Sequence, residues 1–428
     1  MHDGIHAGKP TSSGAARVAV IPLILIVSLF FLWGVANNLN DILITQFKKA
    51  FVLSDFQAGL VQSAFYLGYF FFAIPAGLFM RRFGYKGAVL AGLVLYAAGA
   101  FLFYPAAEAH HYGSFLLALF VLASGLAFLE TSANPLMTVL GPPAGAARRL
   151  NFAQAFNPLG SISGVLIGQH FIFSGVEHST DALAAMTPDA RAAYFASESA
   201  AVQTPYLVIG TIVAIWALLV LVTRFPKTID HDADQSGGFA HLGKLMRNRL
   251  FVFSVIAQFF YVGAQVGVWS FLIRYAQDTV PGTLEKDAAN YLTASLVLFI
   301  AGRFLGTFAM RFLPASRLLA GFALVNILLA AVAVTAPGQT GLYALVAISF
   351  FMSLMFPTIF ALGLSGLGDD DRKLGSSLLV MSIIGGAILT ALMGLVSDLY
   401  GIHNSMAVPL LCFAFILAFA LRSRHSTA

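Results

Sequence analysis

The stretch GLFMRRFGYK, residues 77–86, places three basic residues between two long apolar runs at about 57–80 and 87–107. Each run exceeds the roughly 20 residues that a helix needs to cross about 30 Å of hydrocarbon. Both are far too long for the strands of a membrane barrel, which have about 9–11 residues. The stretch is therefore predicted to be a short charged turn between two membrane-spanning helices.

Similar apolar runs recur along the whole chain. Of the 428 residues, 59% are hydrophobic and only 10% are charged, against about 25% charged in soluble domains, so a water-soluble globule is excluded. We expect an all-α integral membrane protein. Twelve spans are predicted, at about 19–46, 57–80, 87–107, 113–139, 152–174, 204–225, 250–277, 288–312, 317–336, 341–366, 374–399 and 404–422.

The distribution of basic residues predicts the topology. Lysine and arginine near helix ends are retained on the cytoplasmic side. With both termini inside, 18 of the 24 basic residues fall in cytoplasmic segments. An even number of spans with both ends in the cytoplasm, in one energised bilayer, indicates a multi-pass protein of a bacterial inner membrane.

Two longer connections divide the chain. The external one, at about 175–203, contains Thr187-Pro188-Asp189, an N-cap followed by proline, which predicts a short surface helix through Ala201. The internal one contains Gly237-Gly238 and separates six spans from six. The predicted units are a tail at 1–18, a bundle at 19–225, a linker at 226–248, a second bundle at 249–422 and a tail at 423–428.

The two halves resemble each other weakly. The segment at 77–83 has a counterpart at 306–312, Pro135 corresponds to Pro357, and Gly160 corresponds to Gly385. Together these matches predict a duplicated six-helix unit, an arrangement in which transporters rock two pseudo-symmetric bundles about a central site.

Three ionisable residues fall inside predicted spans: Asp41, Glu130 and Arg303. Each costs about 2.5–3.5 kcal/mol on insertion scales, so such residues usually have a task or a partner. Asp41 shares one helix face with Asn37 and Asn38. This polar stripe is either a structural hydrogen-bond network, a hydrated helix end, or a carboxyl exposed alternately to each side of the membrane. Arg303 either pairs with a buried carboxylate or carbonyls, or contacts the ligand directly.

Amides accompany the second carboxyl. Asn134 follows Glu130 by four residues, and Gln154 and Asn157 share a face of the next span. Amides both donate and accept hydrogen bonds, which matches sugar hydroxyls better than lipids or apolar drugs, although amides also pin helices together. A second polar and aromatic stripe can cover a sugar ring, with Trp33 added from the first span, although buried tryptophans are more often packing residues. Its members are Gln258, Tyr261, Gln265 and Trp269.

The sequence contains no motif typical of an enzyme, a metal site or a nucleic-acid-binding protein. The chain has no Walker loop, HExxH, GxSxG or metal-ligand cluster. Its single cysteine, Cys412, excludes a disulfide within the chain, and the net charge of +5 is too scattered for a nucleic-acid face. We therefore expect no enzyme and no cofactor or metal, and transport that is passive or driven by a gradient.

Specific motifs resemble a known family. Twelve spans with a Gly77–Lys86 turn resemble the major facilitator superfamily, although Met80 or Arg81 stands where its usual acidic residue lies, so the usual gating salt bridge is not assigned. The segments FLWG (31–34), NNLNDIL (37–43), LETSANP (129–135) and RLNFAQAFN (149–157) look like the fucose permease group of sugar–cation symporters, which includes glucose/galactose and N-acetylglucosamine permeases.

The resemblance implies proton-coupled uptake of a neutral hexose or deoxyhexose. It implies that Asp41 and Glu130 are the coupling carboxyls and that Gln154 and Asn157 lie near the sugar. Some relatives use sodium instead of protons. The remaining readings are a multidrug exporter of the same superfamily and a sugar sensor without flux. We expect a monomer in a lipid bilayer, and the residues alone do not select one sugar.

Overall fold

The computed structural model describes residues 20–51, 55–172, 185–225, 238–283 and 285–423. Among these residues, nine helices are long and apolar enough to cross a membrane. The number is below twelve for three reasons: one of the nine contains two predicted spans, the fifth span is split into shorter helices, and the first span is represented only by the shorter apolar stretch Ile21–Asn37. All twelve predicted spans nevertheless lie on helices where they are described.

The first six spans form one bundle. The range of α2 holds two helices, which meet at a break inside the predicted turn, where Gly84 takes a φ of 73°, a conformation that favours glycine. The predicted short helix after Thr187 is confirmed, since the Thr187 hydroxyl accepts a hydrogen bond from the Ala190 amide at 3.3 Å. The elements are α1 (Val20–Phe51), α2 (Asp55–Glu108), α3 (Tyr112–Val139), η1 (Pro143–Gly145), α4 (Ala146–Gln154), α5 (Phe156–Ile167), η2 (Gly168–Ile172), α7 (Pro188–Ala200) and α8 (Gln203–Val222).

The last six spans form the second bundle, and two of them are broken near the middle. A helix that the sequence analysis did not predict, α9 (Gly238–Arg247), precedes this bundle; its Leu245 is buried and its Lys244 ammonium lies 2.7 Å from an Asp371 carboxylate oxygen. The remaining elements are α10 (Arg249–Thr279), α11 (Glu285–Ala309), α12 (Ala315–Thr335), α13 (Gln339–Met352), α14 (Met355–Gly363), α15 (Asp369–Met381), η4 (Ser382–Ile384), α16 (Gly385–Tyr400), α17 (Ile402–Ser405) and α18 (Ala407–Ser423).

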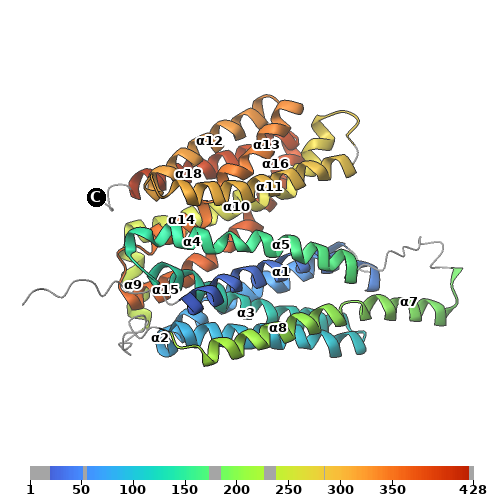
Figure 1. Ribbon diagram of the computed structural model, residues 1–428. Helices are drawn as coiled ribbons and strands as arrows, with labels where there is room; N and C mark the ends of the chain where they lie inside the picture. The colour runs from blue at the N-terminus through green and yellow to red at the C-terminus, as the bar shows by residue number, and fades with distance from the viewer. Residues whose placement is uncertain (1–19, 52–54, 173–184, 226–237, 284, 424–428) are drawn as a thin grey trace, which may run out of the picture.

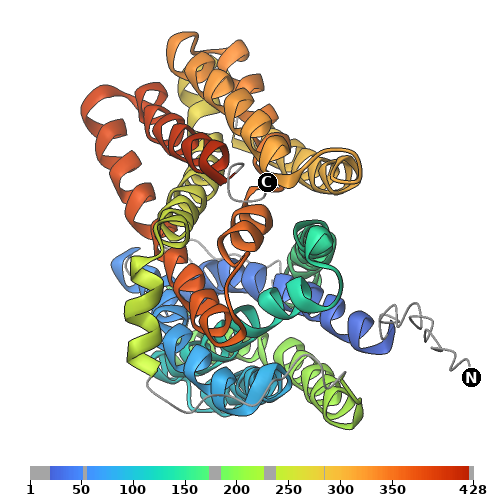
Figure 2. The same cartoon turned by 90° about the vertical axis from the view of Figure 1, so that its left-hand side faces the viewer.

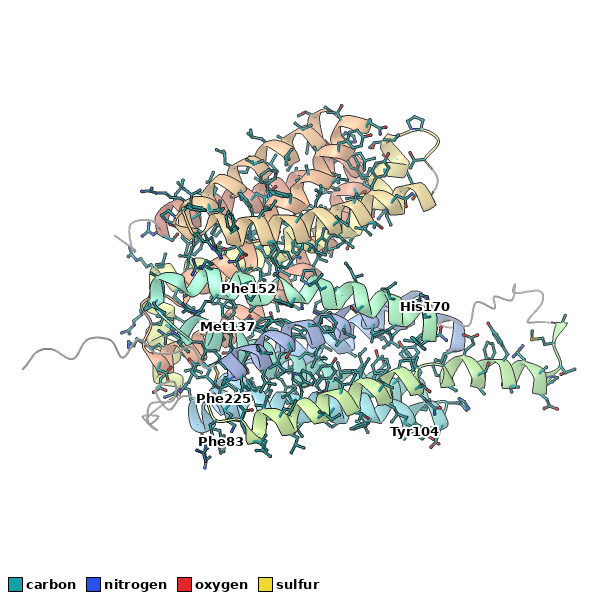
Figure 3. All side chains as sticks on the ribbon, viewed as in Figure 1. Phe83, Tyr104, Met137, Phe152, His170 and Phe225 are labelled. Atoms are coloured by element: carbon teal, nitrogen blue, oxygen red, sulfur yellow. The ribbon has the colours of Figure 1, made fainter. Side chains whose placement is uncertain are left out.

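The bundles meet at one end and diverge at the other. They are close where α9, α14 and α15 lie, and separate toward the end that carries α7 (Figure 1). Viewed from the first end, α9 leads up into the second bundle (Figure 2). Phe152 lies near the meeting end, and His170 lies where the bundles diverge (Figure 3). We call the end with α15 the closed end and the end with α7 the open end.

Charged side chains join the bundles at the closed end. The Asp369 carboxylate accepts a hydrogen bond from the Tyr85 hydroxyl at 3.1 Å and lies 2.7 Å from the Lys373 ammonium. Arg81 lies 3.8 Å from Asp370. Burial, and then the Asp369 carboxylate, raise the pKa of Tyr85 well above its usual value, so its phenol stays a donor. The turn at 77–86 therefore faces acids that come from α15.

A proline also shapes this junction. Pro135 has no N–H, so the carbonyl of Thr131, four residues earlier in α3, loses its helical donor. The Ser376 hydroxyl of α15 donates to that carbonyl at 2.8 Å. A helix break in one bundle thus becomes an acceptor for the other.

Candidate functional site

A cavity of about 590 Å³ lies between the two bundles. Eight of the residues singled out in the sequence line it, from both halves of the chain: Trp33, Asn37, Glu130, Gln154, Asn157, Gln265, Trp269 and Arg303. The cavity is mixed in character, because amides, a carboxyl and a guanidinium share its wall with aromatic and aliphatic side chains. This composition is typical of a small-molecule site.

Glu130 is the buried acid of the cavity. It lies on α3, most of whose residues are buried, and is 1% exposed. Its Oε2 has no hydrogen-bond partner. The Trp33 indole and the Tyr69 hydroxyl also line the cavity. An ionised carboxylate is costly to bury without donors, whereas the neutral acid is tolerated and can donate a hydrogen bond.

Two amides stand on the helix break between α4 and α5. The Gln154 side-chain amide donates to Asn134 Oδ1 at 2.9 Å, and the Asn157 amide donates to the Phe30 carbonyl at 3.3 Å. These contacts hold the amide nitrogens of Gln154 and Asn157 against the first bundle. The Gln154 Oε1 is left directed at the second bundle, where the Arg303 guanidinium lies 3.5 Å away.

The second bundle supplies an aromatic corner. The Trp269 indole donates to the Ser349 hydroxyl at 3.1 Å, and its ring meets Phe299 edge-on, with centroids 5.0 Å apart. Ser349 also contacts the Ser295 hydroxyl. The Trp269 ring is thereby held in one orientation beside Gln265, which suits the C–H face of a sugar ring.

Arg303 forms part of the cavity and also holds main-chain carbonyls. Its Nε donates to the Ser353 carbonyl at 2.6 Å, and its Nη1 donates to the Gln154 carbonyl at 3.0 Å. The guanidinium lies 4.7 Å from the centroid of the Phe299 ring. The sequence left two roles open for Arg303, which were pairing with a carboxylate or carbonyls and direct contact with a ligand. The structure shows the pairing with carbonyls.

Several residues singled out in the sequence do not line the cavity. Asn134, Gln258 and Tyr261 are completely buried, and Asn134 stands behind Gln154. The Tyr261 ring packs near Phe356, and neither its hydroxyl nor the Gln258 amide has a hydrogen-bond partner.

Two further members of the predicted set belong to α1. The backbones of Asn38 and Asp41 belong to that helix. Their side chains lie outside the described residues.

The aromatic contribution of α2 was not predicted from the sequence. Phe65, Tyr66 and Tyr69 line the cavity, as do Phe299 and Phe356 of the second bundle. The three-residue spacing of Tyr66 and Tyr69 was the available signal. It is weak, because tyrosine is also enriched where spans meet the membrane surface.

Known proteins resemble this chain over nearly its full length. The model of the Major Facilitator Superfamily matches residues 23–383. The L-fucose-proton symporter of Escherichia coli K12 is 50% identical over 422 residues, covering 97% of this chain and 96% of its own. A glucose/galactose transporter of Brucella abortus is 38% identical, covering 92% of each chain.

A solved structure supports the same assignment. The crystal structure of the transporter FucP in the outward conformation superposes with a TM-score of 0.89 at 50% identity, covering 95% of this chain and 99% of that one. The twelve helices in two bundles, the cavity between them and these similarities lead to one conclusion. The chain belongs to the major facilitator superfamily.

Proposed function

We propose that the protein is a secondary transporter that imports a neutral hexose or deoxyhexose together with a proton by alternating access. The observation that carries the proposal is the position of Glu130, a buried acid with an unpartnered oxygen in the same cavity as four amides and two indoles. The amides and indoles suit a sugar, and the acid suits a proton. The two relatives described above are named as a fucose–proton symporter and a glucose/galactose transporter, which supports both parts.

The coupling follows from desolvation. A carboxyl that takes up a proton at one side becomes neutral, so it can pass through a closed intermediate without an exposed charge. An inward-moving proton gains about 2.3 kcal/mol per 100 mV of membrane potential. That energy suffices to concentrate a neutral sugar more than about tenfold. The family resemblance adds Asp41 as a second coupling carboxyl.

We further propose the topology and the state. Residues 19–225 and 249–422 are the two rocking units, joined by the linker at 226–248. The termini and the closed end face the cytoplasm of a bacterium, and α7 faces the outside of the cell. The bundles are therefore in the outward-facing state, in which they diverge toward the outside. The end of α18 lies at the same end of the molecule as α9, as an even number of spans requires (Figure 1). The protein acts as a monomer in the inner membrane.

Uptake into proteoliposomes tests the proposal. Labelled L-fucose, D-galactose, D-glucose and N-acetylglucosamine are offered with an imposed proton gradient, an imposed sodium gradient or neither. We expect one of these sugars to accumulate with the proton gradient alone. Accumulation with sodium alone would replace the proton by sodium, and no uptake of any sugar would reject the proposal in favour of an exporter or a sensor.

Variants of the acids test the coupling. Glu130→Gln and Asp41→Asn should abolish accumulation, because neither side chain can then carry a proton, while downhill exchange can persist. Glu108→Gln is the matched control, since Glu108 is exposed at the end of α2 and should accumulate sugar normally. If both Glu130→Gln and Asp41→Asn accumulate sugar like the native protein, the coupling residues are assigned wrongly.

A further inference from the structure

Arg303 binds two main-chain carbonyls that have lost their helical donors for the same reason. The Ser353 carbonyl lies four residues before Pro357, and the Gln154 carbonyl lies four residues before Pro158. Proline has no N–H, so neither carbonyl can complete the usual helical hydrogen bond. A buried carbonyl without a donor is costly, and one guanidinium satisfies both.

The two carbonyls belong to opposite bundles. Gln154 ends α4 of the first bundle, whereas Ser353 stands between α13 and α14 of the second. Arg303 belongs to α11 and is 4% exposed. The planar fork of an arginine is suited to hold two acceptors at once in a fixed geometry. One buried side chain therefore ties the bundles together beside the cavity.

We propose that Arg303 is a clasp between the bundles that bound sugar releases. The inference rests on the proposed sugar transport. Arg303 and Gln154 both line the cavity, and Nη1 also lies 3.5 Å from Gln154 Oε1. A sugar hydroxyl can accept a hydrogen bond from the Arg303 guanidinium and donate one to a Gln154 oxygen. The sugar can therefore replace Gln154 as the acceptor for Arg303, and replace Arg303 as the donor to Gln154. The closed end can then open, because the clasp no longer joins its two sides.

Asn134 is a positioning residue in this scheme. It accepts from the Gln154 amide nitrogen at 2.9 Å and is completely buried. This contact leaves Gln154 Oε1, and not the nitrogen, as the group facing Arg303. Asn134 therefore acts on the clasp without lining the cavity.

A cysteine at the closed end can report the release. Ser377 of α15 is 1% exposed, donates to the Leu374 carbonyl of its own helix and packs against Gly77 of α2 in the other bundle. In a Cys412→Ala background, Ser377→Cys should react slowly with a water-soluble maleimide in nanodiscs, and faster when the closed end opens. The rate is measured with and without the sugar that the uptake panel identifies, or with L-fucose if none is identified.

Arg303→Gln should raise the reaction rate without sugar by roughly tenfold, the loss of about one charge-assisted hydrogen bond. Added sugar should accelerate the native reporter but give no further increase in Arg303→Gln. Arg303→Lys should lie between the two, because a single ammonium does not hold two carbonyls in a fork.

A second variant reaches the clasp from the other side. Pro158→Ala supplies an N–H that can satisfy the Gln154 carbonyl, so the contact with Arg303 should weaken and the sugar-free rate should rise with the arginine intact. Arg311→Gln and Pro75→Ala are matched controls, since both residues are exposed, and neither should change the rate. Elution of each variant as a single species in size-exclusion chromatography verifies folding. If Arg303→Gln does not fold, the sugar-free rate of Pro158→Ala alone tests the clasp.

The outcomes separate the clasp from the transport proposal. Failure of the native protein to take up any sugar would reject the proposed function. The maleimide reaction rates measured without sugar would still test whether Arg303 joins the bundles. Unchanged sugar-free rates in both Arg303→Gln and Pro158→Ala would overturn the clasp, even with normal sugar uptake. So would an undiminished acceleration by sugar in Arg303→Gln.

Discussion

The Tyr69 hydroxyl donates to no acceptor although the residue is only 4% exposed and lines the cavity. A bound sugar can supply that acceptor. Tyr69→Phe should therefore raise the sugar concentration for half-maximal uptake about three- to tenfold, the worth of one neutral hydrogen bond. Concentration-dependent uptake of the labelled sugar measures the change.

Tyr96→Phe is the matched control for this change. The Tyr96 hydroxyl already donates to the Leu32 carbonyl at 3.1 Å, and Tyr96 does not line the cavity. Its loss should lower the stability of the first bundle by about 1 kcal/mol and leave the sugar dependence of uptake unchanged. Equal half-maximal concentrations in Tyr69→Phe and native protein would show that Tyr69 does not contact the sugar.

Helical spacing predicts which face of a span is polar, and this was enough to find the acid and the amides of the cavity. Trp33, Asn37, Glu130, Gln154 and Asn157 all line it. Spacing does not tell how far a residue lies along the path between the bundles. The stripe on α10 shows this limit, because Gln265 and Trp269 reach the cavity whereas Gln258 and Tyr261 are completely buried.

At the scale of elements, α1 and α5 approach so closely that only glycine fits at the contact. A Cβ added to Gly34 would overlap the Asn157 carbonyl, and one added to Gly160 would overlap the Phe31 carbonyl. Gly34→Ala should therefore push α5 away, costing about 1–3 kcal/mol of stability and weakening sugar binding through the displaced Asn157. Thermal unfolding and equilibrium binding of labelled sugar measure the two effects.

Gly321→Ala is the control, because nothing lies within 4 Å of a Cβ at that position of α12. It should leave sugar binding unchanged and slightly raise stability, as alanine favours helix. If Gly34→Ala binds sugar and unfolds like Gly321→Ala, the close contact does not position Asn157.

Element boundaries were predicted best where local chemistry sets them. The cap at Thr187 and the following proline gave the start of α7. The helix α9 was not expected in the linker, because the partners that stabilise it lie far along the chain: its Lys244 pairs with Asp371. Likewise α1 extends to Phe51, beyond the predicted end. There the buried Gln46 amide donates to the Glu198 carboxylate and carbonyl of α7, each at 2.8 Å.

At the scale of the whole molecule, the charges of α15 hold the closed end. Asp369 is 21% exposed in its side chain and faces the Lys373 ammonium, which is buried. Asp369→Asn should weaken this end and shift molecules toward opening there, with correspondingly fewer open at the α7 end. A Ser270→Cys reporter in the cavity, in a Cys412→Ala background, should then react more slowly with a maleimide added from the α7 side of sealed vesicles.

Asp398→Asn makes the same substitution at an exposed site of α16 and should not alter the Ser270→Cys rate. An unchanged or faster rate in Asp369→Asn would show that the Asp369 contacts do not favour this state.

The division into two bundles could be predicted from matches such as Pro135 with Pro357. The closed end could not. A transporter that alternates must encode contacts for both of its states, and a sequence does not rank them. The contact of Arg81 with Asp370 also joins positions that are remote in the chain, and the missing acid of the turn gave no indication that α15 supplies it.

Some buried polar groups at the junction between the bundles have no hydrogen-bond partner, and this affects how fast the junction can open. Asn151 donates across it to Thr358, and the Thr131 carbonyl accepts across it from Ser376, yet Asn151 Oδ1 and the Thr131 hydroxyl remain without partners. Each such buried group forgoes about 1–3 kcal/mol. A seal with every group matched would be slower to break, by about tenfold for each 1.4 kcal/mol. We therefore expect the mismatches to lower the barrier to opening, so that a variant with every group matched would cycle more slowly.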